Sequence, residues 1–317
     1  MAFEPSRQLL ADEHCWEDAD VVPRQPEMTA FRRRLRYQQA QWREANGHPI
    51  GTQPIVPKHG KPSRPLGSRI PLDYARQTGA NFLTAAAHDA ATARLAAKEP
   101  HQMLDEQRLW ADLLSSMPMC FNLFGDLAAD PMLADRAVHT LWPDAPGEVT
   151  QVRFEHSPGR LDADYLGNLT AFDVAVVLDV DDDRRAIIGV ETKYHEWAKP
   201  ETAKPTRLDR YRQVAEASEA FVPGVEETVN GTGLLQIWLD HLLVLSMLQH
   251  HSGQWAWGRF VLVYPEANSD VAAACERYQQ LLVDRSTFTP LTIEEMLAAD
   301  VLPATSTTRF CDRYLPR

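Results

Sequence analysis

The 317-residue sequence lacks the cysteine patterns that mark a disulfide framework or a zinc site. Its four cysteines, Cys15, Cys120, Cys275 and Cys311, lie far apart, and none belongs to a CxxC pair. Such sites require cysteines at short, regular spacing. We therefore expect reduced thiols in a cytoplasmic protein.

Long hydrophobic runs are also missing. The longest, LLQIWLDHLLVLSML at 234–248, is too short to span a bilayer and contains Asp240 and His241. The first twenty residues are acidic and lack the apolar segment of a secretory signal, so we expect no membrane segment. The motifs GxxxxGK[ST], GxGxxG, HExxH and GxSxG are absent, which leaves P-loop nucleotide hydrolysis, zinc proteolysis and serine hydrolysis without sequence support.

Positive charge is scarce overall but concentrated in one region. The net charge is −12, which argues against a protein that coats nucleic acid by bulk attraction. Residues 24–84 nevertheless carry eleven Lys or Arg against three acids, a balance of +8, which leaves −20 for the rest of the chain. Two interpretations stay open: a basic arm that contacts nucleic acid, or an arm that docks on its own acidic body.

The basic region divides into a helix and a connection. Residues 28–45 place Phe31, Leu35 and Trp42 on one side at helical spacing, with the arginines at 32, 33 and 36 largely elsewhere. The following segment, 46–72, is rich in Pro and Gly and predicts an extended, irregular connection. We therefore expect a basic N-terminal arm and linker over residues 1–80 and one domain over residues 81–317.

The rest of the chain predicts helices followed by a mixture of strands and helices. Helices are expected at 81–98, 101–116, 130–142, 207–221, 233–250 and 270–282, with an apolar turn, MCFNLFGDLA, at 119–128. Strands are expected at 149–156, 172–179, 186–194 and 257–265, the middle two as an antiparallel hairpin. This order predicts an α/β (α+β) fold with a mixed central sheet flanked by helices.

Two carboxylates lie inside apolar strands of the expected hairpin. Residues two apart share a face of a strand, so Asp173 shares its face with Ala175, and Glu191 and Lys193 share theirs with Ile187. If the hairpin pairs so that these faces coincide, two carboxylates and an ammonium converge. Hard oxygen ligands suit Mg²⁺, which can polarise a phosphodiester. Lys193 would then position or activate a water, or neutralise charge that develops on phosphorus.

The hairpin's other acids form a contrasting group. DVDDDRRAIIGVE, 179–191, begins like a calcium loop, but Arg184 stands where Gly is needed and Val190 where Glu is needed. We interpret the acids from Asp179 to Asp183 as a solvated turn. His241 and the pair His250 and His251 lack ligand spacing, and we interpret them as ordinary helix residues.

The spacing of Asp173, seventeen residues, then Glu191-Thr192-Lys193 resembles the D…(D/E)xK signature of the PD-(D/E)XK nuclease superfamily. The segments FNLFGDLA, FEHSPGR, AFDVAV, GVETKYHE and LLQIWLDHLL resemble blocks of a bacterial family of restriction-endonuclease-like proteins within it. This resemblance implies a restriction-endonuclease-like core with Asp173, Glu191 and the carbonyl of Thr192 as ligands of Mg²⁺ or Mn²⁺. It also implies that Lys193 is the catalytic lysine. One departure is that Phe172 replaces the proline that names the superfamily.

Two further residues are candidates for the site. Glu155, in RFEHSPGR, either pairs with Arg153 or Arg160 at the rim of the sheet or acts on a metal or water. Gln236 lies one helical turn before Asp240 on a polar patch of an apolar helix. The resemblance implies a glutamine near the lysine, whereas the alternative is a hydrogen bond within the core.

The expected function is metal-dependent hydrolysis of phosphodiester bonds in nucleic acid, with DNA favoured over RNA. One alternative is a catalytically inactive nuclease-fold protein that binds nucleic acid or regulates, although the complete Asp173, Glu191 and Lys193 set argues against it. Another is an acidic protein whose basic arm serves self-association. A homodimer is also considered, because nucleases that cut both strands often pair their active sites.

Overall fold

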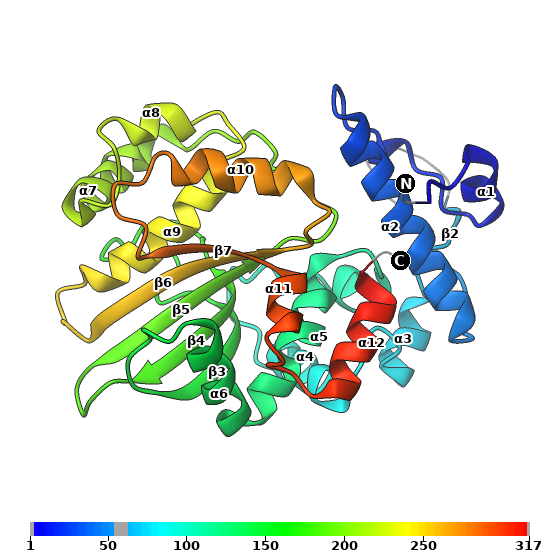
Figure 1. Ribbon diagram of the computed structural model, residues 1–317, viewed down its shortest axis with the longest axis horizontal. Coiled ribbons are helices and arrows are strands. Elements are labelled where there is room, and N and C mark those ends of the chain that lie inside the picture. Colours follow the sequence, from blue (N-terminus) through cyan, green and yellow to red (C-terminus); the bar gives the residue numbers. More distant parts are fainter. Residues whose placement is uncertain (1–2, 54–62, 316–317) are drawn as a thin grey trace.

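Helices cover both faces of a central five-stranded sheet in the computed structural model, which describes residues 3–53 and 63–315 (Figure 1). The strands, in spatial order, are β3 (Glu148–His156), β4 (Phe172–Asp179), β5 (Arg185–Thr192), β6 (Trp255–Tyr264) and β7 (Phe288–Thr292). β3, β4 and β5 are antiparallel neighbours, whereas β6 and β7 run parallel to β5. The sheet is therefore mixed, and the predicted α/β architecture is confirmed.

The remaining elements are mostly helices. The α-helices are α1 (Arg7–Asp12), α2 (Pro26–Ala45), α3 (Leu72–Thr78), α4 (Ala85–Ala96), α5 (Ser116–Ala129), α6 (Pro131–Leu141), α7 (Leu208–Ser218), α8 (Val225–Val229), α9 (Leu235–Leu248), α10 (Ser269–Gln279), α11 (Ile293–Ala298) and α12 (Ala304–Tyr314). Shorter elements are η1 (Asp18–Asp20), the π-helix η3 (Gln107–Ala111), η4 (Pro205–Arg207), and a small ladder of β1 (Gly51–Thr52) with β2 (Pro65–Leu66). Across residues 3–53 and 63–315, no helix combines the length and apolar character needed to cross a bilayer.

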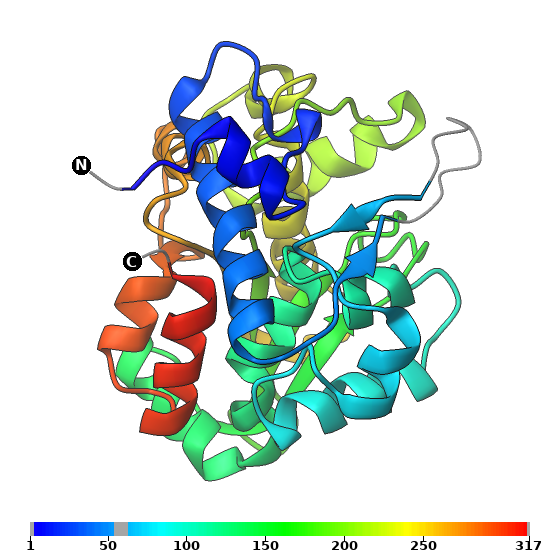
Figure 2. The ribbon, with the colours of Figure 1, turned by 90° about the vertical axis from the view of Figure 1, so that its right-hand side faces the viewer.

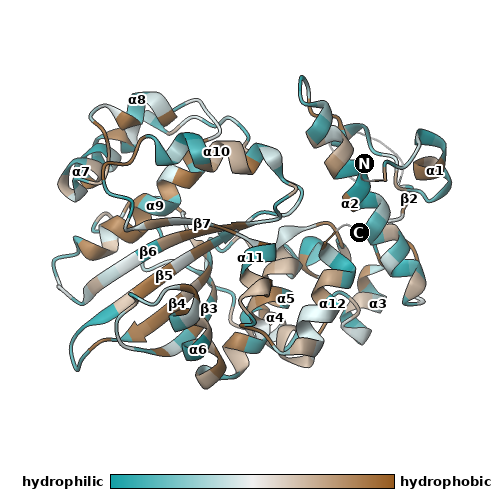
Figure 3. Ribbon diagram, viewed as in Figure 1, coloured by the Kyte–Doolittle hydropathy of each residue, from teal (hydrophilic) through white to brown (hydrophobic). Residues whose placement is uncertain are grey.

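The central strands are apolar because both of their faces are covered. Ala175 and Val177 belong to a buried cluster with α7, α9 and α10, whereas Val174 and Val176 belong to a cluster with α2, α5 and α12. Figure 3 shows the resulting hydrophobic colour along β4 to β6. A strand that is buried on both faces is expected to be a nearly continuous hydrophobic run. Asp173 shares its face with Ala175, so its side chain belongs to the α9 face.

The basic helix α2 is part of the core. Phe31 and Leu35 are fully buried in the same cluster as the sheet, and Figure 2 shows α2 running alongside α12. The expectation that Arg32 and Arg36 lie away from the packed side is wrong, because both are buried near Asp20, which Arg36 binds through two hydrogen bonds. Of the two interpretations of the basic region, the structure shows docking for this helix.

Other parts of the basic region are described only in part. Residues 54–62 of the expected irregular connection, which include Lys58 and Lys61, lie outside the described residues. A boundary at residue 80 stays a prediction, since Ile70 and Ala75 lie in the same buried cluster as the strands of the sheet.

Several local predictions were wrong. The apolar turn at 119–128 is the middle of α5, and the helix at 101–116 is reduced to the π-helix η3. β7, α11 and α12 were not predicted. The boundary between α5 and α6 follows from sequence chemistry, because the side chain of Asp130 accepts from the N–H groups of Met132 and Leu133 and Pro131 occupies the first turn.

Candidate active site

Three neighbouring strands bring three acidic residues into register at one end of the sheet. Val174 of β4 pairs with Val190 of β5, so Asp173 lies opposite Glu191 one residue further along. The register of β3 against β4 places Glu155 opposite Asp173 on the other side. The condition on which the predicted convergence depended, matching faces in the hairpin, is met.

Hydrogen bonds fix the four central side chains. Asp173 Oδ2 accepts from the N–H of Thr192 at 2.8 Å and from its hydroxyl at 2.6 Å. Glu191 Oε1 accepts from Lys193 Nζ at 2.7 Å and from Gln236 Nε2 at 2.8 Å. Gln236 Oε1 in turn accepts from Lys193 Nζ at 2.8 Å. The first turn of α9 thus delivers Gln236 to the site, and Glu191, Lys193 and Gln236 form a closed network.

Burial and crowding shift the protonation of the central groups. Burial, together with the charge of Glu191, raises the pKa of Asp173 above its usual value. Burial by itself would lower the pKa of Lys193, but the charge and hydrogen bond of Glu191 outweigh it and raise that pKa. Lys193 is therefore a cation at neutral pH, suited to stabilising negative charge on a substrate.

Glu155 forms one of the ion pairs considered for it and also lines the cleft, whereas a role on a metal or water stays a prediction. Arg160 Nη2 lies 3.6 Å from Glu155 Oε1, which is one of the two ion pairs that the sequence suggested. The N–H of Met103 donates to the same oxygen at 3.2 Å. Its side chain nevertheless lines the same cleft as Asp173, and burial raises its pKa. Its backbone φ of 51° lies in the left-handed region, which non-glycine residues rarely adopt outside sites that hold them there. Arg153 points elsewhere and donates to Gln151.

Asp240 is a fourth acid at the site. It lies one helical turn after Gln236 on α9, and only 4% of its surface is exposed. Its Oδ2 is buried without a hydrogen-bond partner, and burial followed by the charge of Glu191 raises its pKa well above the usual value. The sequence placed Asp240 beside Gln236 but gave no signal that its carboxyl group is buried and unpartnered.

The acids line a cleft of 620 Å³ that also contains cations. Arg108 follows the start of η3, and Lys204 and Arg207 belong to the loop and turn before α7. Sequence reasoning did not select these three residues. A cleft lined by both acids and cations is compatible with a metal ion that meets a polyanionic substrate.

The donor set fits a divalent metal ion. Asp173 and Glu191 lie opposite each other on adjacent strands, and Glu155 and Asp240 line the same cleft. These four carboxyl groups, together with those of Glu196 and Glu201, share this cleft with Lys193, and Asp240 Oδ2 lacks a hydrogen-bond partner among the described residues. Carboxylate oxygens of this kind suit Mg²⁺ or Mn²⁺, for which Asp173 and Glu191 are the central ligands by position.

One family model, described as the PD-(D/E)XK nuclease superfamily, matches residues 26–316. The match begins at the first residue of α2 and includes every strand of the central sheet. The chain belongs to this superfamily. Members of the PD-(D/E)XK superfamily are usually hydrolytic nucleases and generally use divalent metal ions. Neither the curated proteins nor the solved structures that were compared with the chain include a match.

The departure from the PD-(D/E)XK signature at Phe172 has a structural counterpart. A Cβ atom at Gly189 would lie 2.4 Å from the ring of Phe172, so the ring occupies the space that a side chain on β5 would need. Phe172 thereby packs directly across the two strands that carry the acids. Thr192 donates two hydrogen bonds to Asp173, and the role of its carbonyl as a ligand stays a prediction.

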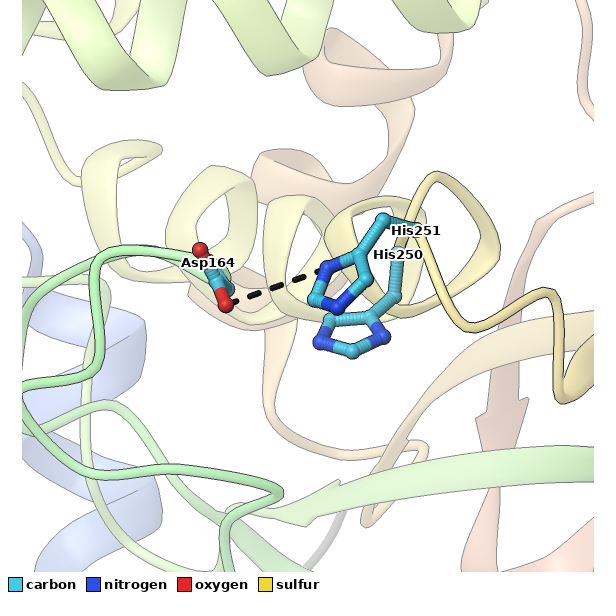
Figure 4. Close-up of side chains that lie close together, drawn as sticks. All are labelled: Asp164, His250 and His251. Carbon is cyan, nitrogen blue, oxygen red and sulfur yellow. Dashed lines mark ion pairs between the residues drawn. The ribbon is translucent and has the colours of Figure 1, made fainter.

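Groups outside the cleft differ from this site. The hairpin residues from Asp179 to Asp183 are mostly exposed, and Asp181 pairs with Arg184, as a solvated turn requires. Asp164, His250 and His251 offer ligand atoms within 4.8 Å of one another, with an ion pair of 3.8 Å between Asp164 and His251 (Figure 4). The two histidines follow the end of α9 and are not helix residues as expected. Asp164 and His251 are exposed, unlike the acids of the cleft.

Proposed function

We propose that this protein is a metal-dependent nuclease that hydrolyses phosphodiester bonds of nucleic acid, with DNA as the favoured substrate. The observation that carries the proposal is the register of Glu155, Asp173 and Glu191 on three adjacent strands, with Lys193 directly beyond them. The membership of this chain in the PD-(D/E)XK nuclease superfamily supports the same reaction.

The residues divide the work by chemistry. Asp173 and Glu191, with the carbonyl of Thr192, would hold Mg²⁺ or Mn²⁺, and Glu155 would act on the metal or a water beside them. When bound, such an ion would supply Lewis-acid polarisation of the phosphodiester and a lowered pKa for a coordinated water. Lys193 contributes a fixed positive charge for the negative charge that develops on phosphorus. Gln236 contacts both Glu191 and Lys193 and holds their relative positions.

The proposal also covers how the substrate is bound, how it is cut and how the protein assembles. Arg108, Lys204 and Arg207 would contact the phosphates of the substrate, which makes binding dependent on salt. We further propose internal cleavage by an endonuclease, a cytoplasmic location and a homodimer that pairs two sites on a duplex. A protein that binds nucleic acid without cutting it is the contrasting function, and the complete set of acids and lysine in one cleft speaks against it.

Cleavage assays on duplex DNA, single-stranded DNA and RNA with Mg²⁺, Mn²⁺ or EDTA test the proposal. We expect metal-dependent cleavage that falls by about 10²–10⁴ in Lys193→Ala and Glu191→Gln, because each removes a charge from the reacting centre. Asp182→Asn is the matched control, since this exposed hairpin acid lies outside the cleft, and it should cut like the wild type. Unchanged cleavage in both site variants would contradict the proposed mechanism.

A further inference from the structure

One arginine of α2, Arg32, is buried and held only by a long ion pair with Asp20. Among the described residues, the other buried arginines each donate hydrogen bonds; these are Arg36, Arg69, Arg259 and Arg313. Arg32 retains only 10% of its side-chain exposure, its Nε is buried and unpartnered, and its nearest acid is Asp20 at 3.7 Å. Both oxygens of Asp20 already accept hydrogen bonds from Arg36, at 2.5 and 2.7 Å.

A bound oxyanion would supply this guanidinium with hydrogen-bond acceptors. Arginine remains charged in proteins and presents five N–H donors in a planar fork. A buried donor without an acceptor costs free energy, which a bound oxyanion would recover. Phosphate oxygens match the fork in geometry and in charge.

Arg32 opens into a cavity that adjoins the catalytic lysine. The cavity has a volume of 300 Å³, and its lining includes Lys193, His195, Trp197 and Lys199 besides Arg32. Lys193 and Gln236 line both this cavity and the acidic cleft, so the two spaces meet at the lysine. The helix α2 thus places one guanidinium in a cavity that shares Lys193 and Gln236 with the acidic cleft.

The two acids that line this cavity, Glu196 and Glu201, do not pair with Arg32. Glu196 Oε1 accepts from the Ser116 hydroxyl, and its Oε2 accepts from the N–H of Tyr194. Glu201 is exposed. Neither forms an ion pair with Arg32 within 4 Å among the described residues. An incoming anion therefore finds free donors on Arg32 and a second cation on Lys199.

We propose that Arg32, assisted by Lys199, binds a phosphate group of the nucleic-acid strand adjacent to the phosphodiester that is cut at Lys193. This inference rests on the proposed nuclease function and adds α2 to the substrate-binding surface. It also gives the docked basic helix a role in substrate binding that its buried position does not otherwise suggest.

Strand binding in Ca²⁺, measured by fluorescence anisotropy over a range of salt concentrations, tests this proposal without cleavage. We expect Arg32→Gln to weaken binding about tenfold and to reduce the slope of log affinity against log salt by about 0.7 for a single strand. Arg34→Gln removes the same charge from the same helix and should retain both wild-type values. Arg32→Lys keeps the charge without the fork, so it should keep the slope and lose affinity.

Strands with a 5′-phosphate, a 3′-phosphate or neither identify the bound group. A loss in Arg32→Gln that is equal on all strands assigns an internal phosphate, and a loss confined to one phosphorylated end assigns a terminal phosphate. Binding and salt slopes equal to those of the wild type in both Arg32 variants, with unchanged thermal unfolding, would overturn the inference. Absence of metal-dependent cleavage by the wild type, alongside binding that depends on Arg32, would count against the proposed nuclease function alone.

Discussion

Asp240 lines the acidic cleft, and its buried carboxyl group is expected to lower the stability of the folded protein. Its carboxyl group is buried on α9 near Glu191 and Asp173, and Oδ2 has no hydrogen-bond partner. A buried polar group without a partner destabilises the folded state, and like charges add to that cost. Natural proteins retain such residues where activity requires them. Asp240 is therefore expected to lower stability in the absence of a bound cation.

Asp240→Asn should raise the free energy of unfolding by about 1–2 kcal/mol without metal, because it removes the crowded acid. The raised pKa of Asp240 sets the sign of the pH dependence: the folded state holds a proton that the unfolded state releases as pH rises above the acid's usual range. The gain should therefore be larger at alkaline than at acidic pH in chemical denaturation. Asp179→Asn, an exposed hairpin acid, is the control and should change stability by less than about 0.5 kcal/mol. A destabilised Asp240→Asn would show that the carboxyl group is satisfied in the folded protein.

At the scale of elements, α5 is a helix that sequence patterns interpreted as a turn. Ten of its fourteen residues are buried, so it has no polar face to generate a helical period. A helix enclosed on all sides cannot be distinguished by periodicity from an apolar turn or strand. Gly125 allows its close contact with α4, because a Cβ there would lie 2.5 Å from the Cα of Ala87.

Gly125→Ala should therefore destabilise the protein by about 1–3 kcal/mol, since backbone must move to admit the methyl group. Helix propensity by itself predicts the opposite, a gain of about 1 kcal/mol for alanine over glycine. Chemical denaturation decides between the two terms. Ala128→Gly on the same helix is a useful comparison, because propensity should dominate at this partly exposed position. Higher stability in Gly125→Ala would mean that α4 and α5 separate without cost.

At the scale of the whole molecule, a hydrophobic cluster covers each face of the sheet. His241 of α9 packs against the cluster that contains α7, α9 and α10. Its ring is fully buried and contacts the hydroxyls of Tyr278 at 2.9 Å and Thr287 at 2.8 Å. Burial lowers its pKa to about 3. The folded protein therefore holds this histidine neutral, whereas the unfolded chain protonates it near the usual histidine pKa.

Stability should consequently fall as the solution is acidified. Between about pH 7 and about pH 5, His241 by itself should cost about 2 kcal/mol, because the unfolded state binds a proton that the folded state excludes. His241→Gln should have lower stability at neutral pH but a correspondingly weaker acid dependence. His251→Gln, on the exposed loop after α9, should retain the wild-type dependence. Equal pH profiles for wild type and His241→Gln would contradict this assignment.

The sequence by itself determined the features that depend on local pattern. The apolar runs with a short charged connection specified the β4–β5 hairpin, and its register follows from the connection between adjacent strands. Because the side-chain period of a strand is two, Glu191 and Lys193 could be assigned to one face of their strand before the fold was known, and their convergence with Asp173 depended only on how the hairpin pairs. The mixed sheet with flanking helices followed from the order of the elements.

Tertiary structure decided the features that depend on contacts between distant segments. Sequence pattern could not show that Asp20 accepts two hydrogen bonds from Arg36 and forms only a 3.7 Å ion pair with Arg32, because the two arginines compete for this carboxylate only after α2 docks. The exposure of Asp240 and the pairing of Glu155 with Arg160 likewise depend on which elements cover them. The free-energy cost of a buried charge depends on the side chains that surround it, which is why the sequence could name the acids but left open which contacts each one makes.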